Sequence, residues 1–454
     1  MNIYTSVCAS LLFPIHERLK SHTSVAVRRR LEEQERWPRE KLEEWRVSQL
    51  RTFLQRIGLS VPFYRDLFAQ LNFNPTDLHS IADLQSLPLT DKKLMKSAGD
   101  RLRSDNAGPL MRYNTGGSSG EPLIFHIGKD RKSHDVGAKW RVTRWWGVDI
   151  GDPEIVVWGS PIELGAQDRI KQVRDTILRT ELLPAFEMSE SKLDHFVSEI
   201  SKRRPAMIFG YPSALSLIAN HARQRGIHMD KLGIRVAFVT SERLYDEQRA
   251  LISEAFGCPV ANGYGARDAG FIAHECPHGG MHLQAEDVIV EIVSPSGEVL
   301  PSGQAGEIVV THTATHEFPF LRYRTGDIGT LSDKLCTCGR TLPLISEIHG
   351  RTTDFVVAAD GTIMHGLALI YTVRDLPGVE RFKIIQHTLD HVEVQVVAGN
   401  PFDQEAEARI IKDYKARLGQ QVGVTISRVN EIPPEKSGKF RYVVSHVALP
   451  GTLQ

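Results

Sequence analysis

The chain has little of several features that mark particular classes of protein. Its five cysteines are too few for the disulfide framework of a small secreted domain. Its 55 basic and 55 acidic residues cancel, so the chain as a whole lacks the basic excess that attracts nucleic acid or anionic lipid. We therefore expect neither a disulfide scaffold nor a nucleic-acid partner.

Long hydrophobic runs are also missing. The longest early run, from about Val7 to Ile15, is interrupted by Ser10 and Pro14 and is too short to span a bilayer. No basic stretch precedes it, as it would in a secretory signal peptide. These absences predict a cytoplasmic protein without a membrane span.

The composition that remains is that of a globular protein, with 41% apolar and 24% charged residues. A chain of 454 residues is too long for one ordinary core, so two or three domains are expected. The region from about Val25 to Ile57 has apolar residues at helical spacing among dense mixed charge, which predicts one or two amphipathic helices.

From about Leu87 to Arg243, short apolar runs alternate with helical stretches. Ile155–Trp158, Met207–Phe209 and Val236–Val239 are predicted strands, each followed by small or turn-forming residues. The predicted helices between and after them are Lys192–Ser201, Ala214–Arg225 and Asp246–Phe256. This repetition favours an α/β fold with a mainly parallel sheet and with function at the carboxyl ends of the strands.

The pattern changes beyond about Gln284. The two runs Val288–Val293 and Gly306–Thr311 predict an antiparallel hairpin. After about Gly350 the sequence predicts strands at Phe382–Gln386 and His391–Val397, a helix at Gln404–Leu418 and a final strand at Val424–Val429. About a hundred residues of this kind are typical of a small autonomous α+β domain.

The stretch from Tyr113 to Pro122 is rich in glycine and hydroxyl groups. Its central residues are Thr115, Gly116, Gly117, Ser118, Ser119 and Gly120. Such a loop can aim backbone N–H groups and hydroxyls at a polyphosphate, although the spacing of its residues is neither that of a P-loop nor that of a dinucleotide-binding loop. The alternative is a flexible surface turn.

Three further motifs follow in order. Gly263–Gly270 places an aromatic ring and a carboxylate in a glycine-rich turn, and Tyr323–Asp327 places a carboxylate in a turn after a strand. Pro433–Arg441 carries Lys439 in an exposed glycine-containing loop. A lysine in such a loop is, taken alone, a solvated surface charge.

With these motifs and Gly350-Arg351, the chain resembles the adenylate-forming superfamily of acyl-CoA synthetases, adenylation domains and luciferases over nearly its whole length. More narrowly, it resembles the branch of phenylacetate–CoA ligase-like and capsular polysaccharide biosynthesis-type proteins. The resemblance implies an N-terminal adenylate-forming domain at 1–350, with mixed α/β sheets and a small β-rich zinc subdomain at about 276–345. It also implies a mobile α+β lid at 351–454.

The resemblance also assigns roles to single residues. The loop from Thr115 to Gly120 would hold the β- and γ-phosphates of ATP, and Arg351 would contact the ribose or a phosphate. Tyr264 would pack on the adenine beside Gly265, and Asp327 would accept hydrogen bonds from the ribose hydroxyls. Glu242 falls where relatives line the adenine pocket.

Two residues would be catalytic. Asp268 stands where the family usually has a glutamate that binds Mg²⁺, and its shorter side chain reduces its reach. Lys439 would bridge the α-phosphate and the attacking carboxylate, relieving the repulsion between them in the transition state. Aromatic residues near the strand ends (Trp158, Phe209 and Tyr211, close to Gly263) favour a flat, apolar or aryl acid as substrate.

Cysteines and histidines on two loops form a candidate zinc site. Cys276 and His282 lie on one loop, and Cys336 and Cys338 lie on another. Four N/S ligands suit a structural Zn²⁺ ion, and the phenylacetate–CoA ligase-like branch often has this arrangement. The alternatives are His278 or His274 as the fourth ligand, or three reduced cysteines without metal.

Cys8 and Cys258 stand alone and are expected to be buried.

The acyl acceptor stays open at this point. Coenzyme A is the acceptor in coenzyme A ligases of the branch, but the residues after the Gly-Arg motif depart from the usual pattern: Thr353 stands where an aspartate is usual, and Asp354 follows it. The segment 358–366 is more similar to the capsule-type relatives. An amine or a carrier-protein thiol is therefore an alternative acceptor, and a non-catalytic descendant of the fold is an alternative of another class.

Overall fold

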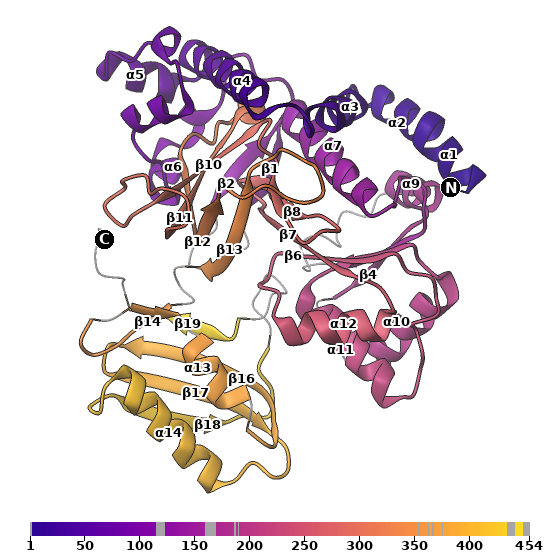
Figure 1. Cartoon of the computed structure of the whole chain (residues 1–454), viewed down its shortest axis with the longest axis vertical. Coiled ribbons are helices and arrows are strands. Elements are labelled where there is room, and N and C mark those ends of the chain that lie inside the picture. Colours follow the sequence, from indigo (N-terminus) through magenta and orange to yellow (C-terminus); the bar gives the residue numbers. More distant parts are fainter. Residues whose placement is uncertain are drawn as a thin grey trace.

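The computed structural model of the chain has a large N-terminal part and a small C-terminal part (Figure 1). It describes residues 2–114, 123–158, 169–185, 188, 190–351, 355–361, 363–365, 367–374, 376–433 and 441–447. At 169–172, 350, 351, 355, 363–365, 367, 368 and 371 the backbone alone is described. The glycine-rich loop at 115–122, the segment 352–354 and Lys439 lie outside the described residues.

Helices make up the first hundred residues. They are α1 (Ile3–Val7), a π-helical turn η1 (Cys8–Leu12), α2 (Phe13–Leu19), α3 (Ser24–Gln34), α4 (Arg39–Ser60), α5 (Pro62–Gln70), η2 (Pro75–Asp77), η3 (Ile81–Ser86), α6 (Lys92–Ala98) and η4 (Gly99–Leu102). The two helices α3 and α4 confirm the amphipathic pattern predicted for this region. Buried leucines and aromatic side chains of α4 and α5 join the core under the antiparallel strands.

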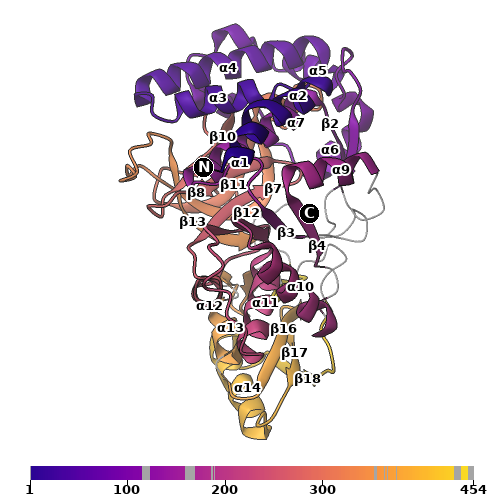
Figure 2. The same cartoon turned by 90° about the vertical axis from the view of Figure 1, so that its right-hand side faces the viewer.

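The N-terminal part is built around one sheet of eleven strands, which lies below these helices in Figures 1 and 2. Its strand order is β10-β11-β12-β13-β9-β8-β7-β6-β5-β3-β4. The bounds are β3 (Glu154–Trp158), β4 (Thr180–Pro184), β5 (Met207–Gly210), β6 (Val236–Thr240), β7 (Val260–Ala266), β8 (Gly270–Glu275), β9 (Met281–Leu283), β10 (Val288–Val293), β11 (Ala305–His312), β12 (Tyr323–Ser332) and β13 (Leu344–Arg351). A two-stranded antiparallel pair, β1 (Met111–Asn114) and β2 (Ile124–Ile127), stands beside it.

The sheet changes direction at β7. Strands β4, β3, β5, β6 and β7 pair in parallel, which confirms the α/β prediction for this region. From β8 onward every pair within this eleven-stranded sheet is antiparallel, and β10 and β11 form the predicted hairpin. The sequence places this change near Gln284, whereas it occurs at Gly270, and the β-rich region continues the same sheet. A run of apolar residues alone does not show which neighbour a strand pairs with.

Helices cover the parallel strands and close their core. They are α7 (Lys129–Trp145), α9 (Arg169–Leu178), α10 (Glu190–Arg203), α11 (Pro212–Gln224) and α12 (Asp246–Phe256), with η5 (Thr313–Thr315) in the β-rich region. Buried apolar side chains of α10, α11 and α12 pack on β3, β5 and β6. The helices predicted from the sequence are therefore confirmed.

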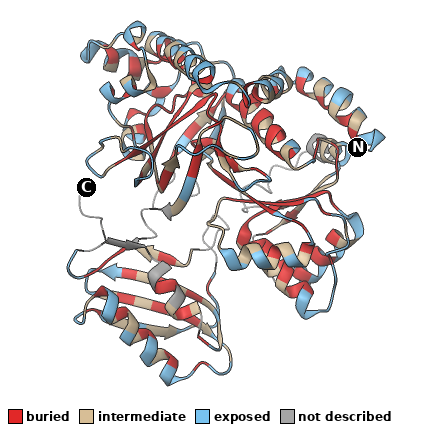
Figure 3. Cartoon of the chain, in the orientation of Figure 1, coloured by how far each residue is buried: buried red, intermediate tan, exposed pale blue. Residues whose placement is uncertain are grey.

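The C-terminal part has a core of its own, seen as a separate set of buried positions in Figure 3. It contains β14 (Phe355–Val357), β15 (Ile363–His365), α13 (Leu367–Arg374), β16 (Val379–Thr388), β17 (His391–Ala398), α14 (Gln404–Leu418), β18 (Gly423–Arg428) and β19 (Val443–Ser445). Its sheet order is β18-β17-β16-β19. The strand predicted at Val424–Val429 is confirmed as β18, but it is not the final strand, because β19 follows it and pairs in parallel with β16.

Among the described residues, no helix has the length and apolar content needed to cross a bilayer.

Candidate functional site

Aromatic side chains gather at the carboxyl ends of the parallel strands. Trp158 ends β3 and stacks on Tyr211, which follows β5, with ring centroids 4.3 Å apart. The Trp158 ring also lies 5.6 Å from Phe209, and Phe209 stacks on Phe238 of β6. The residues predicted to line an acid pocket therefore lie together, because parallel strands bring their carboxyl ends to one edge of the sheet.

Glu242 lies at the same edge, just after β6. Its carboxylate accepts a hydrogen bond of 3.1 Å from the backbone N–H of Ser213 in the first turn of α11. A carboxylate is favourable there because a helix N-terminus presents unpaired N–H groups and partial positive charge. Glu242 thus ties the end of β6 to the start of the helix that follows β5.

Two tyrosines and two aspartates join β7 to β12. Each segment carries a tyrosine and, four residues later, an aspartate: Tyr264 and Asp268, and Tyr323 and Asp327. The Tyr264 hydroxyl donates to Oδ2 of Asp327 over 2.9 Å. The Tyr323 hydroxyl donates to Oδ2 of Asp268 over 2.7 Å. The residue predicted to hold adenine is therefore bonded to the residue predicted to hold ribose.

Asp268 is buried, with several backbone and side-chain contacts. Its Oδ1 accepts from the backbone N–H of Ala269 over 3.1 Å, while Oδ2 accepts from Tyr323. Its backbone carbonyl accepts from Nη1 of Arg131 on α7 over 3.0 Å. A carboxylate oxygen has two acceptor directions, so each oxygen keeps one for another partner.

Arg131 is a residue of this region that the sequence motifs do not indicate. It lies 137 positions from Asp268, and nothing in the local pattern of α7 marks it. Gly270 has a φ of +89°, and a Cβ at this position would lie 2.7 Å from Nη2 of Arg131. Glycine is therefore required at the end of the turn, both for its backbone conformation and for the arginine beside it.

The other motif segments meet the same turn. Arg267 donates from Nη1 to the carbonyl of Asn114 over 3.3 Å, so the last residue before the glycine-rich loop lies next to the Gly263–Gly270 turn. Asp327 and Arg351 are directly paired across β12 and β13. Ends of β1, β7 and β13 thus converge on one region of β12.

The four predicted zinc ligands come together between β9 and the loop before β13. Their ligand atoms all lie within 4.8 Å of one another. Sγ of Cys276 lies 3.6 Å from Sγ of Cys336, and Sγ of Cys338 lies 3.2 Å from Nε2 of His282. No disulfide joins any of the five cysteines. Three thiols and one imidazole at these separations fit the donor set of a tetrahedral Zn²⁺ ion.

The imidazole of His282 is oriented for such a role. Its Nδ1 lies 3.2 Å from the carbonyl oxygen of Leu342, so Nδ1–H donates there and the lone pair of Nε2 faces the thiols. Burial lowers the pKa of His282 to about 4, which keeps the ring neutral, as a metal ligand must be. Gly280 leaves room for the cluster, since a Cβ there would lie 2.6 Å from Sγ of Cys336.

The two alternative histidines lie elsewhere. Nδ1 of His278 is 3.2 Å from the hydroxyl of Thr337 on the exposed side of the loops. The ring of His274 packs against Phe238 and Phe271. Neither belongs to the group of four whose ligand atoms converge.

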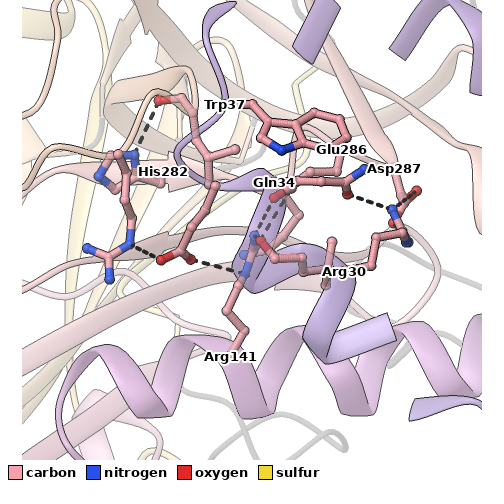
Figure 4. A network of polar contacts seen from close by, with 12 residues as sticks. Arg30, Gln34, Trp37, Arg141, His282, Glu286 and Asp287 are labelled. Carbon is pink, nitrogen blue, oxygen red and sulfur yellow. Dashed lines mark hydrogen bonds and ion pairs between the residues drawn. The ribbon is translucent and has the colours of Figure 1, made fainter. Parts of the chain in front are cut away.

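A network of polar contacts lies next to His282, one residue of the cluster (Figure 4). Arg340 donates to Glu35 over 3.1 Å, and the ring of Trp145 lies edge-on to His282. Glu35 also accepts from Trp145 over 2.8 Å, and the fully buried Arg141 forms an ion pair with Glu286. Glu35 directly follows α3, and the other residues come from α7 and the β-rich region. The sequence indicated none of them, because no local spacing links them.

Comparisons with known proteins agree with this architecture. Residues 356–446 match the family described as the CapK C-terminal domain. The chain is 23% identical to Protein CapK of Staphylococcus aureus over 399 residues, covering 87% of each chain. It is 26% identical to phenylacetate-coenzyme A ligase of Thermus thermophilus over 452 residues, covering 91% of this chain and 98% of the relative.

Solved structures share the fold. A 2-hydroxyisobutyryl-CoA ligase in the postadenylation state superposes with a TM-score of 0.72, at 20% identity and with 91% of each chain covered. ATP-bound MatB from Rhodopseudomonas palustris superposes with a TM-score of 0.52 at 17% identity, covering 72% of this chain and 65% of that one. At these identities the likeness shows the mixed α/β architecture and its C-terminal α+β part.

Proposed function

Because the chain is a phenylacetate–CoA ligase-like member of the adenylate-forming superfamily, we propose that it activates a carboxylic acid with ATP. A carboxylate oxygen attacks the α-phosphorus, and the bond to the β-phosphate breaks, giving an acyl-adenylate and pyrophosphate. The acyl group then passes to a thiol of coenzyme A, with AMP as the leaving group. The substrate is an aryl or similarly flat, apolar acid.

The observation that carries this proposal is the hydrogen bond from Tyr264 to Asp327. It joins the aromatic residue proposed for adenine to the carboxylate proposed for ribose, two groups that a bound nucleoside would contact together. A carboxylate has two acceptor oxygens, which suits the two hydroxyls of a ribose. The backbone of Arg351 is paired directly opposite Asp327 on the next strand.

Electrostatic stabilisation supplies the chemistry of the first step. The glycine-rich loop from Thr115 to Gly120 holds the β- and γ-phosphates in this proposal. The support is the hydrogen bond from Arg267 to Asn114, the last described residue before the loop. Lys439 neutralises charge between the attacking carboxylate and the α-phosphate. Residues 1–350 and 351–454 form the two domains of the enzyme, with Lys439 on the smaller one.

Mg²⁺ binds at Asp268 in this proposal, through the acceptor directions that Tyr323 and Ala269 leave open. The hydroxyl of Tyr323 holds the shorter aspartate in one orientation. The cation would supply charge neutralisation for the pyrophosphate leaving group.

Zn²⁺ is bound by Cys276, His282, Cys336 and Cys338 in this proposal. Four protein ligands leave no open position, so its role is structural. The support is the convergence of the four donor atoms and the second hydrogen bond of the imidazole.

Exchange of labelled pyrophosphate into ATP tests the first step. The purified chain is assayed with a panel of aryl and short aliphatic acids, and exchange that depends on one class of acid is the expected result. Folded protein that exchanges no label with any acid would instead indicate a non-catalytic descendant of the fold.

Mass spectrometry with coenzyme A, amines and a carrier protein tests the second step. The relatives named as phenylacetate-coenzyme A ligases support an acyl-CoA product. An amide or an acylated carrier protein, with no thioester of coenzyme A, would replace this acceptor while leaving the adenylation step intact.

A further inference from the structure

The first helical segment carries a row of large apolar side chains that face away from the protein. Its five members recur at every fourth position and are between 43% and 83% exposed. They are Ile3, Val7, Leu11, Ile15 and Leu19. We refer to these five residues as the N-terminal apolar row. A patch of this kind on a folded protein marks a site of contact with another apolar surface.

The π-helical turn keeps this row straight. In an α-helix of 3.6 residues per turn, a step of four residues advances about 40° beyond a full turn, so a row at this spacing drifts around the helix. At η1 the backbone N–H of Phe13 bonds to the carbonyl of Cys8, five residues back. The wider π-helical turn contains more residues per turn than an α-helix. Four residues therefore fall short of a full turn there, which reverses the drift of the row around the helix.

The opposite face of the segment is bound firmly to the protein. Thr5 donates to Asp152 over 2.9 Å, and Phe13 packs edge-on against Trp140 with ring centroids 5.1 Å apart. Cys8 lies directly over Gly151, where a Cβ would come within 2.4 Å of the Cys8 Cβ. Because these contacts fix the rotation of the helix, the apolar row cannot turn inward.

The neighbouring helix α9 extends the apolar surface. Figure 1 shows α9 beside α1, and the Tyr4 hydroxyl donates to the carbonyl of Ile177 over 2.8 Å. On α9, Val173 and Ile177 lie four residues apart and are 60% and 41% exposed. The helix next to the row thus carries exposed apolar side chains of its own.

The exposed charged side chains of the first helical segment are all positively charged. Within residues 2–21, all of which the structure describes, the exposed charged side chains are Arg18 and Lys20. The one acidic residue of this stretch, Glu17, is buried and bonded to His16 and His22. Arg179, directly after α9, is exposed, while Asp175 of α9 is paired with the adjacent Arg174. Among the described residues 2–21 and 173–178, the one acidic side chain that is not buried is therefore Asp175, which already has a cationic partner.

We propose that this surface lies on an anionic lipid bilayer, with the N-terminal apolar row inserted at the level of the headgroups and Arg18 and Lys20 bound to lipid phosphates. A helix that exposes large apolar residues next to cations is the kind that binds in the plane of a membrane interface without crossing it. The C-terminal part lies toward the other end of the long axis of the molecule, away from this surface (Figure 1).

Vesicle flotation of the full chain tests the proposal. The wild type is expected to float with vesicles of phosphatidylcholine containing about one-third phosphatidylserine, and much less with phosphatidylcholine alone. The double substitution Leu11→Glu/Ile15→Glu should weaken binding by more than about tenfold. The double substitution Arg18→Glu/Lys20→Glu should reduce the affinity for these vesicles by roughly tenfold or more at low salt. Each cation near an anionic surface contributes about fivefold to that affinity.

The matched control is Leu59→Glu, which places the same charge on an exposed leucine at the end of α4 and should leave vesicle binding unchanged. Circular dichroism and pyrophosphate exchange in solution verify that each variant is folded, and vesicle binding needs no catalytic activity. A wild type that does not float, or a Leu11→Glu/Ile15→Glu variant that floats equally well, would overturn the proposal. So would a dimer in light scattering that the same variant converts to a monomer without any vesicle binding.

Discussion

The hydroxyl of Tyr264 donates a hydrogen bond of 2.9 Å to Oδ2 of Asp327, a residue 63 positions away in the sequence. The matching bond from Tyr323 to Asp268 runs in the opposite direction between the same two segments. A tyrosine in each segment thus orients the aspartate of the other. The two aspartates have different proposed ligands, ribose for Asp327 and Mg²⁺ for Asp268, so the two bonds can be tested separately.

Replacing Tyr264 by phenylalanine keeps the ring and removes the hydrogen bond to Asp327. We expect the KM for ATP in pyrophosphate exchange to rise by about tenfold, because one hydrogen bond to a charged group contributes about 1.5 kcal/mol. Tyr323→Phe is the matched substitution, and it should raise the concentration of Mg²⁺ needed for half-maximal exchange. Identical effects of the two substitutions on both quantities would contradict the separate roles.

Lys439→Ala should abolish most adenylation while leaving nucleotide binding largely intact. Loss of a cation that acts in the transition state is expected to lower the exchange rate by roughly a hundredfold or more. The ATP dissociation constant should change by less than about threefold, because the ground state uses other contacts. Lys436→Ala, in the same segment, is the control, and an unchanged exchange rate in Lys439→Ala would refute the role of this lysine.

Cys336→Ser should remove the bound metal. Elemental analysis of the wild type is expected to find about one equivalent of zinc per chain, and the variant should contain almost none. Its melting temperature should fall by at least about 5 °C, because the metal stabilises the folded form of the two loops. Cys258→Ser changes a buried cysteine that is not part of the cluster and should retain zinc. Wild-type protein without metal would disprove the site.

Stability should fall as the pH drops below 6.5, in part through His316. Burial lowers the pKa of His316 to about 4, Arg56 lowers it further, and Asp130 opposes the change. In the unfolded chain the imidazole of residue 316 takes up a proton near pH 6.5, whereas in the folded chain it does not. The contribution of His316 to the free energy of unfolding is therefore fully present above pH 6.5 and is lost as the pH falls toward 4. At about pH 5 the loss is roughly 2 kcal/mol. In urea titrations, the free energy of unfolding of His316→Gln should decrease less than that of the wild type between about pH 8 and 5, by this amount. An equal decrease in both proteins would contradict the prediction.

Arg141→Met should destabilise the fold strongly. The guanidinium is fully buried between Glu286 and the carbonyl of Leu31, and its loss leaves a buried carboxylate without its counter-charge. We expect the free energy of unfolding to fall by roughly 3–5 kcal/mol. Arg101→Met removes an exposed ion pair with Asp66 and should change it by less than about 1 kcal/mol. Equal effects in urea titrations would show that the buried network contributes little.

Local patterns were enough to predict much of the architecture. The strands β3, β5 and β6 and helix α12 lie where apolar runs and helical spacing predict them, because these patterns reflect which face of an element is buried. The strand β19 was missed, since three residues carry too little pattern to distinguish a strand from a loop. The continuity of the β-rich region with the main sheet was also missed, because strand pairing depends on residues far apart in the sequence.

The sequence by itself determined which residue types could carry the chemistry and in what order they occur: a glycine-rich loop, Tyr264, Asp327, Arg351 and four candidate metal ligands. Only the tertiary structure decided how they combine. It bonded Tyr264 to Asp327, placed His282 rather than His278 against the thiols, and turned the N-terminal apolar row outward. Side-chain chemistry is a local property of the chain, whereas burial and contact depend on which distant segments pack together.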